Sequence, residues 1–189
     1  MTTCITYEVC IDWDATNWAA TPDFSESYDT IAGIVGADGI NLVNIQRGKQ
    51  KEEGNAPAAT CEIRMRPGFH EKYSPFTTDA NLQGKIRPWL PVRVRAYYDS
   101  TYIPLYFGYI SAIRIKPHAD VQSVVFYCTD GIDLLARQMI TQDPNDTEEC
   151  SDGDAIEKIL DAAGWPQSRR SIDTSGGDNL LNYPACTAY

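Results

Sequence analysis

The sequence predicts a mainly β protein with few helices: a β-barrel or sandwich with a short flanking helix, followed by the start of a second, small α+β domain. Residues 61–66 and 92–98 alternate between apolar and polar side chains, as strands do that have one buried and one solvated face. Further strand-like runs are separated by loops rich in glycine, proline and asparagine. A helical period appears in only two segments of the 189 residues.

Six strands are expected along the chain. They are predicted at residues 5–13, 40–47, 59–66, 92–98, 102–116 and 121–128, the fifth with a break near Gly108. The segment 28–34 is strand-like but ambiguous. The loops at residues 48–57 and 67–87 are long. Because long loops in compact domains are usually functional, we expect these two loops to contact partners.

Two helices are expected. The first covers residues 131–139 and has its apolar side chains at Ile132, Leu134, Leu135 and Met139. The second covers residues 154–163; capping residues Ser151 and Asp152 precede it, and Gly164 and Pro166 end it.

A change in composition between the two predicted helices marks a domain boundary. Residues 141–153 hold five carboxylates and a proline, with almost no apolar side chain. We therefore place a first domain at residues 1–145 and the start of a second, incomplete domain with one helix at residues 146–189. A unit of this size can barely bury a core of its own, so it either docks on the first domain or opens a larger one.

Composition and charge exclude several classes of protein. Hydrophobic residues make up 43% of the chain and charged residues 22%, as in ordinary soluble domains. There is no apolar run long enough for a membrane helix, and the N-terminus lacks the basic and apolar regions of a secretory signal. The net charge of −10 repels nucleic acid and anionic membranes, which argues against a protein that grips DNA.

No pattern in the sequence predicts a catalytic or metal site. The six cysteines include no Cys-x-x-Cys pair and are expected to be reduced core residues. His70 and His118 lie in separate loops, and neither a Gly-x-Ser-x-Gly nor a His-Glu-x-x-His motif occurs. The DWD sequence at residues 12–14 fits a turn with Asx hydrogen bonds better than a calcium loop, because the required glycine and glutamate are missing. We predict no catalytic residue, no metal and no cofactor, and not an enzyme.

Eight aromatic residues fall within the stretch from residue 97 to residue 127. They are Tyr97, Tyr98, Tyr102, Tyr106, Phe107, Tyr109, Phe126 and Tyr127. Three interpretations stay open at this point: a core with ordinary cross-strand pairs, a subunit interface, or a platform that binds carbohydrate.

Short motifs spread over about 165 residues carry a family resemblance. In chain order they are DWD at 12–14, DT at 29–30, LVNIQRGK at 42–49, AATCEI at 58–63, EKYSP at 71–75, LPVRVRA at 90–96, LYFGYI at 105–110, CTDGIDLL at 128–135 and IEKILDAAGWP at 156–166. In this order the chain resembles the tail-tip hub, or minor tail protein, family of long-tailed phages. It departs from that family at residues 17–20, where NWAA replaces a Gly-Asp-Phe-like turn, and at residue 189, where such proteins continue.

The resemblance implies a structural virion protein with a tail-tube-like first domain. In such proteins three copies form a ring that continues the tail tube and leaves a channel for DNA exit. The partners implied are further copies of the chain in a trimeric ring, the tail tube, the distal tail protein, the tape measure, and a tip fibre or spike. DNA would pass through the lumen without specific binding, since an acidic wall repels phosphate. The location implied is the virion tail tip, after folding in the host cytoplasm, with no membrane binding by this segment.

The candidate site residues are therefore interface residues. They are Gln50, Lys51, Glu52 and Glu53 in one long loop, His70, Glu71, Lys72 and Tyr73 in the other, and Tyr106 and Tyr109 in the aromatic run. Three alternative functions are kept: a distal tail ring protein with six copies, a carbohydrate- or receptor-binding β-sandwich, and a cell-wall hydrolase that uses some of the many carboxylates.

Overall fold

The structure, a computed structural model, describes residues 5–31, 39–48, 57–66, 68–69, 71–117, 122–137, 150–172 and 179–180. The chain divides into two compact units, Met1–Leu134 and Leu135–Tyr189. A division near residue 145 would fall outside the described residues. Each unit is treated separately below.

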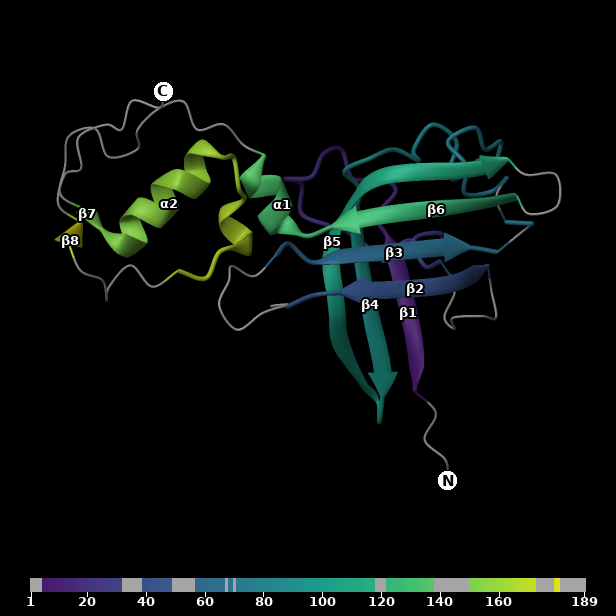
Figure 1. The fold of residues 1–189 in the computed structure, drawn as a ribbon, viewed down its shortest axis with the longest axis horizontal. Coiled ribbons are helices and arrows are strands. Elements are labelled where there is room, and N and C mark those ends of the chain that lie inside the picture. Colours follow the sequence, from purple (N-terminus) through teal and green to yellow (C-terminus); the bar gives the residue numbers. More distant parts are fainter. Residues whose placement is uncertain are drawn as a thin grey trace. The chain divides into compact units, whose positions relative to one another are not determined.

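The first unit is mainly β, as predicted (Figure 1). Its strands are β1 (Thr6–Ile11), β2 (Ile40–Gln46), β3 (Thr60–Met65), β4 (Pro91–Tyr98), β5 (Thr101–Pro117) and β6 (Gln122–Thr129). They form one antiparallel sheet in the order β1-β4-β5-β6-β3-β2. Each of the six predicted strands is present, with ends that differ by a few residues.

The long strand β5 makes the sheet curl. Its first half pairs with β4 and its second half pairs with β6. Figure 1 shows β1, β4 and the first half of β5 running crosswise to β2, β3 and β6. Two bulges accompany the bend: Leu105 has no partner on β4, and Ser111 has none on β6.

The predicted break near Gly108 is wrong, because β5 is continuous there. A side chain at this position would place its Cβ 2.3 Å from the hydroxyl oxygen of Tyr106 and 2.4 Å from the carbonyl oxygen of Thr129. Glycine therefore permits a close approach inside the strand rather than ending it.

The core fills the space between the two halves of the curled sheet. Its largest fully buried side chain is Trp13, which stacks on Tyr73 at 6.2 Å between ring centroids and meets Phe126 edge-on at 6.1 Å. The buried faces of the strands follow the predicted alternation, with Val92 and Val94 of β4 in the core.

The ambiguous segment 28–34 is described only as far as Ile31, and it forms a turn with a single β-bridge between Thr30 and Cys10. The amide of Ile11 donates to the carbonyl of Asp29 at 2.9 Å, and the amide of Ile31 donates to the carbonyl of Val9 at 2.9 Å. This segment therefore covers the outer edge of β1 at its C-terminal end.

Helix α1 (Gly131–Ala136) begins after Asp130, whose carboxylate accepts from the amides of Ile132 and Asp133. It ends at Ala136 and Arg137 forms a turn, so it is shorter than the predicted helix at residues 131–139, whose last two residues lie outside the described residues. The second unit holds β7 (Cys150–Ser151), α2 (Asp152–Ala162), the 3₁₀ helix η1 (Gln167–Arg169) and β8 (Asn179–Leu180). Ser151 caps α2 in a capping box with Asp154, which confirms Ser151 as a cap.

Candidate subunit interface

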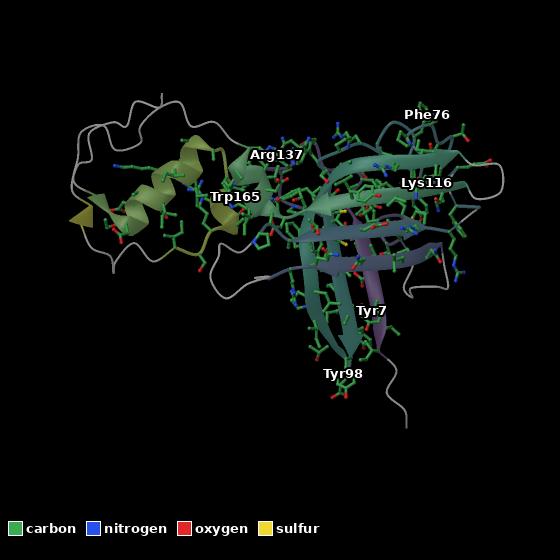
Figure 2. All side chains as sticks on the ribbon, in the orientation of Figure 1. Tyr7, Phe76, Tyr98, Lys116, Arg137 and Trp165 are labelled. Carbon is green, nitrogen blue, oxygen red and sulfur yellow. The ribbon has the colours of Figure 1, made fainter. Side chains whose placement is uncertain are left out.

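Among the described residues, a group of exposed apolar side chains lies at the free end of β1, β4 and β5. Its members are between 39% and 52% exposed, and we call them the hairpin cluster: Ile5, Tyr7, Tyr97, Tyr98, Tyr102 and Ile103. Figure 1 shows this end of the strands extending past β2, and Figure 2 shows Tyr7 and Tyr98 there. Because the end projects, side chains on both faces of the strands are exposed.

The turn between β4 and β5 consists of Asp99 and Ser100, both with positive φ angles of 46° and 63°. Two-residue turns with this geometry match the twist of a β-hairpin, and aspartate tolerates it well. The hairpin is therefore a well-defined element rather than a loose loop.

Side-chain contacts fix one face of the hairpin cluster. The rings of Tyr97 and Tyr102 lie 5.0 Å apart on neighbouring strands. The guanidinium of Arg95 lies 3.9 Å from the centre of the Tyr102 ring, and it donates to the carboxylate of Glu8 at 2.6 Å. Arg93 also reaches Glu8, at 3.3 Å.

The ion pairs also set the charge of Glu8. Burial alone would raise the pKa of Glu8, but hydrogen bonds from Cys10 and Arg95 and the charges of Arg95 and Arg93 together lower it. Glu8 therefore stays ionised between the two arginines, and it holds β1 and β4 together on this face.

A second exposed apolar position lies in the loop between β3 and β4. Phe76 is 84% exposed, more than any other large hydrophobic side chain among the described residues. It borders a hollow of about 350 Å³ that is lined by Glu71, Ser74, Phe76, Thr77, Thr78 and Ile115. Figure 2 places Phe76 at a different end of the first unit from Tyr98.

Buried carboxylates organise the loop that follows β1. Asp12 accepts hydrogen bonds from the amides of Asp14 (3.1 Å), Ala15 (2.9 Å) and Asp23 (2.9 Å). Asp14 pairs with Lys85 at 2.6 Å and with the hydroxyl of Tyr28. This is the Asx-turn arrangement, and backbone amides occupy the Asp12 oxygens that a calcium ion would use.

Asp29 is the second buried carboxylate of this loop, and it is only 2% exposed. It accepts from the amides of Trp13 (3.5 Å) and Glu26 (3.1 Å). Burial raises its pKa to about 6, although the two amide hydrogen bonds act in the opposite direction. Its role is to hold the loop against β1.

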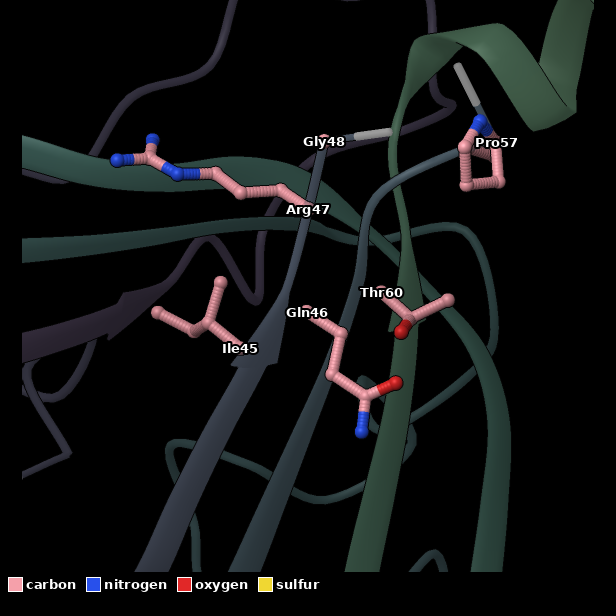
Figure 3. Close-up of a pocket in the computed structure, with 7 residues that line it drawn as sticks. Ile45, Gln46, Arg47, Gly48, Pro57 and Thr60 are labelled. Atoms are coloured by element: carbon pink, nitrogen blue, oxygen red, sulfur yellow. The ribbon is translucent and has the colours of Figure 1, made fainter. Parts of the chain in front are cut away.

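A hollow of about 530 Å³ lies where β2 ends (Figure 3). Its lining is Ile45, Gln46, Arg47, Gly48, Pro57, Ala58 and Thr60. Figure 3 shows the Arg47 side chain extending away from Gln46 and Thr60, and its guanidinium donates to the carbonyl of Leu105 at 2.9 Å. These seven described residues include no carboxylate, thiol or imidazole, so their part of the hollow offers room for a side chain rather than a reactive group.

The structure places five of the ten sequence-predicted interface residues. Glu71 and Lys72 are exposed. Tyr73, Tyr106 and Tyr109 are at most 6% exposed and pack inside the chain, so we leave these three out of the interface proposed below. The other five lie outside the described residues: Gln50, Lys51, Glu52, Glu53 and His70.

Sequence reasoning did not single out Ile5, Tyr7 or Phe76. Phe76 lies in a loop that was expected to contact partners, and this was its only signal. Within the aromatic run, the alternation of β5 would assign each ring to a face, but the bulge at Leu105 shifts that alternation by one residue. Tyr106 consequently joins the core.

Among the described residues, no three histidine, cysteine, aspartate or glutamate side chains are grouped so that they could hold a metal ion. Within the same residues, no helix is long and apolar enough to cross a membrane. No family model matches this chain, and no curated protein matches it either.

Proposed function

We propose that this protein is a structural subunit of a phage tail tip, which works by assembling into a ring with copies of itself. The observation that carries the proposal is the hairpin cluster. Four tyrosines and two isoleucines are exposed together on a defined hairpin. Aromatic side chains grouped in this way are typical of protein interfaces, because they contribute large contact areas at little cost in side-chain entropy.

The position of the exposed apolar residues favours a ring over a symmetric pair. The hairpin cluster and Phe76 lie at different ends of the first unit (Figure 2). When two different surfaces of one subunit meet, the contact is head-to-tail, and such contacts form a ring where the rotation between copies closes. This agrees with the resemblance of the sequence to tail-tip hub proteins, in which three copies form the ring.

The ring would act as a connector and a channel. Its expected neighbours are the tail tube, the distal tail protein, the tape measure, and a tip fibre or spike. A net charge of −10 on each copy suits a lumen through which DNA slides without binding. The ring acts as a scaffold, and no catalytic step is proposed.

The particle mass of the purified full chain tests the proposal. A ring of three copies of the 21.1 kDa chain is expected in native mass spectrometry and in sedimentation velocity. Six copies would instead favour a distal tail ring protein. Immunogold labelling of intact virions should mark the tail tip.

A carbohydrate- or receptor-binding β-sandwich is the second candidate. It is favoured by the exposed rings of Tyr98 and Tyr102, which could stack on sugars. If the chain stays monomeric at high concentration and binds on a glycan array through these tyrosines, the ring proposal fails and this alternative replaces it.

A further inference from the structure

The two edges of the sheet differ in how they are covered. β1 and β2 are the edge strands, and because the sheet has six antiparallel strands, they run in opposite directions along it. An edge strand presents unpaired amides and carbonyls, which can pair with a strand of another chain. Which backbone groups are unpaired follows from the hydrogen-bond pattern of each edge.

At the β1 edge, only the N-terminal end is open. The carbonyl of Val9 and the amide of Ile11 point away from β4 and bond to the segment that contains Asp29 and Ile31. In an antiparallel strand alternate residues point the same way, so the backbone groups of Ile5 and Tyr7 also point outward. No described residue provides a backbone partner for these two.

At the β2 edge, the direction of the backbone groups follows from the hydrogen bonds of the neighbouring strand β3. The amide of Asp130 donates to the carbonyl of Ala59. Because backbone groups alternate in direction along a strand, the amides and carbonyls of odd-numbered β3 residues point toward β6, and those of even-numbered residues point toward β2. In the register of the two strands, Leu42, Asn44 and Gln46 of β2 therefore bond to β3. The backbone groups of Val43 and Ile45 point outward and have no partner among the described residues.

The sequence of β2 lacks the usual protection of an open edge. Its residues, INLVNIQ, include no charged side chain and no proline. Natural edge strands commonly carry such residues to prevent pairing with other chains. A single bulge near Ile40 is the one protective feature within this strand.

We propose that β2 accepts the residues 5–8 segment of a second copy of this chain as an antiparallel strand. Pairing the outward backbone groups places Val43 opposite Tyr7 and Ile45 opposite Ile5. This inference rests on the proposed ring and deepens it, because it names the strands that join one copy to the next.

The side chains match in this register. Val43 and Ile45 lie on the core-facing side of β2, where they are half-buried, and Tyr7 lies on the same face of β1 as Val9. The apolar face would therefore continue from one copy into the next. On the other face Asn44 would meet Thr6, and Leu42 would meet Glu8 at the end of the paired segment, the one apolar-polar pair in this register. A shift by one residue would place apolar side chains against polar ones.

The contact is short, so one pair of copies would associate weakly. Closing a ring makes the last contact intramolecular, which strengthens every contact in the assembly. Ile5 and Tyr7 belong to the hairpin cluster, and its other members, on the neighbouring strands β4 and β5, would add buried area at the same junction.

Cross-linking between copies tests the register. Asn44 and Thr6 would form a non-hydrogen-bonded pair, in which the side chains approach most closely and a disulfide fits. Thr6→Cys protein mixed with Asn44→Cys protein should give a covalent dimer under oxidised glutathione, and reductant should reverse it. Leu42→Cys is the matched control, because residue 42 lies two residues from Asn44 on the same face, would face Glu8 of the other copy, and is out of disulfide reach of Thr6→Cys.

The unsubstituted protein, oxidised in the same way, gives the background from its six native cysteines. A T6C/N44C dimer above this background, with none above it from T6C/L42C, supports the register. Equal yields from both mixtures, or none from either, overturn it.

Proline at residue 45 provides a second test. Ile45→Pro removes an outward amide but leaves the bonds of Leu42, Asn44 and Gln46 to β3, so the variant should fold and remain monomeric. Ile45→Val should assemble like the unsubstituted protein. If Ile45→Pro still forms rings, the inference fails while the ring stands. If the unsubstituted chain forms no ring, the proposed function fails as well.

Discussion

At the scale of single residues, Asp29 shows how a buried charge is tolerated. Its carboxylate lies in the loop after β1 and has two backbone amides as partners. Its pKa of about 6 exceeds the ordinary value of 3.8 because burial penalises the charged form. The protein keeps the group because the same two amides anchor the loop.

The raised pKa of Asp29 predicts how stability depends on pH. Between pH 3.8 and about 6 the folded state binds more protons than the unfolded state, so the free energy of unfolding falls as the pH rises through this window. One pKa unit corresponds to about 1.4 kcal/mol, so the loss is at most about 3 kcal/mol. Urea denaturation of the unsubstituted protein and of Asp29→Asn, at pH 4.5 and pH 7, measures it.

The difference between the two proteins isolates Asp29 from other titrating groups. Glu8, whose pKa is lowered, acts in the opposite direction: it adds stability above its ordinary pKa of 4.5, and this stability is lost as the pH falls. Parallel pH profiles for the two proteins would show that Asp29 does not titrate in this window.

Tyr106 presents the opposite case of a buried polar group without a partner. Its hydroxyl is buried and has no hydrogen bond to the described residues. Removing such a group relieves a desolvation cost, so Tyr106→Phe should stabilise the protein by about 1 kcal/mol. Thermal denaturation checks this. A loss of stability would indicate that the hydroxyl is satisfied, for example by a buried water.

Gly108→Ala is the contrasting substitution at the same place. The added methyl group would lie 2.4 Å from the carbonyl oxygen of Thr129. Removing the Tyr106 hydroxyl does not relieve this clash. The double variant should therefore remain less stable than Tyr106→Phe alone.

At the scale of elements, period-two alternation predicts two of the strands directly. It identified β3 and β4 because one face of each is buried and the other is not. At Gly108 of β5 it could not distinguish a break from a close approach to neighbouring atoms, because glycine is compatible with both. The strands β7 and β8 are each two residues long, which is too short for any periodic signal.

Capping chemistry was equally readable from the sequence. Ser151 precedes α2, its side chain accepts from the amide of Asp154, and Asp154 reaches back to the amide of Ser151. Ser151→Ala should destabilise the second unit by about 1 kcal/mol, because the first turn of the helix loses its partner. Hydrogen exchange of the α2 amides measures this locally.

Ser168→Ala is the control for the cap, since Ser168 is an exposed serine in η1 of the same unit. It should leave the exchange of α2 amides unchanged. Equal protection of α2 in both variants would mean that the capping box contributes little.

At the scale of the whole molecule, the exposed surface of the first unit was harder to predict than its strands. The aromatic run was recognised as a possible interface, but the sequence could not divide it between the core and the surface. That division depends on a bulge at Leu105 and on how far the hairpin projects, and both are set by contacts between distant strands. The residue types alone predict neither the bulge nor the projection of the hairpin.

The hairpin cluster yields the prediction that belongs to this scale. Tyr98 is 45% exposed at the end of the hairpin, so it contributes little to the core of its own chain. A tyrosine at the centre of an interface commonly contributes more than about 1 kcal/mol to binding. Tyr98→Ser should therefore weaken assembly at least about fivefold and leave the melting temperature nearly unchanged. Sedimentation velocity over a range of concentrations measures the association.

Ile132→Ser separates the contribution of this surface from a general loss of hydrophobicity. Ile132 is 54% exposed on α1 and lies outside the hairpin cluster, so its replacement removes a similar exposed apolar side chain from another place. If assembly depends on the hairpin cluster, only Tyr98→Ser shifts the concentration at which copies associate, since solubility changes would affect both variants alike. Identical shifts in the two variants would mean that the hairpin cluster is not where the copies meet.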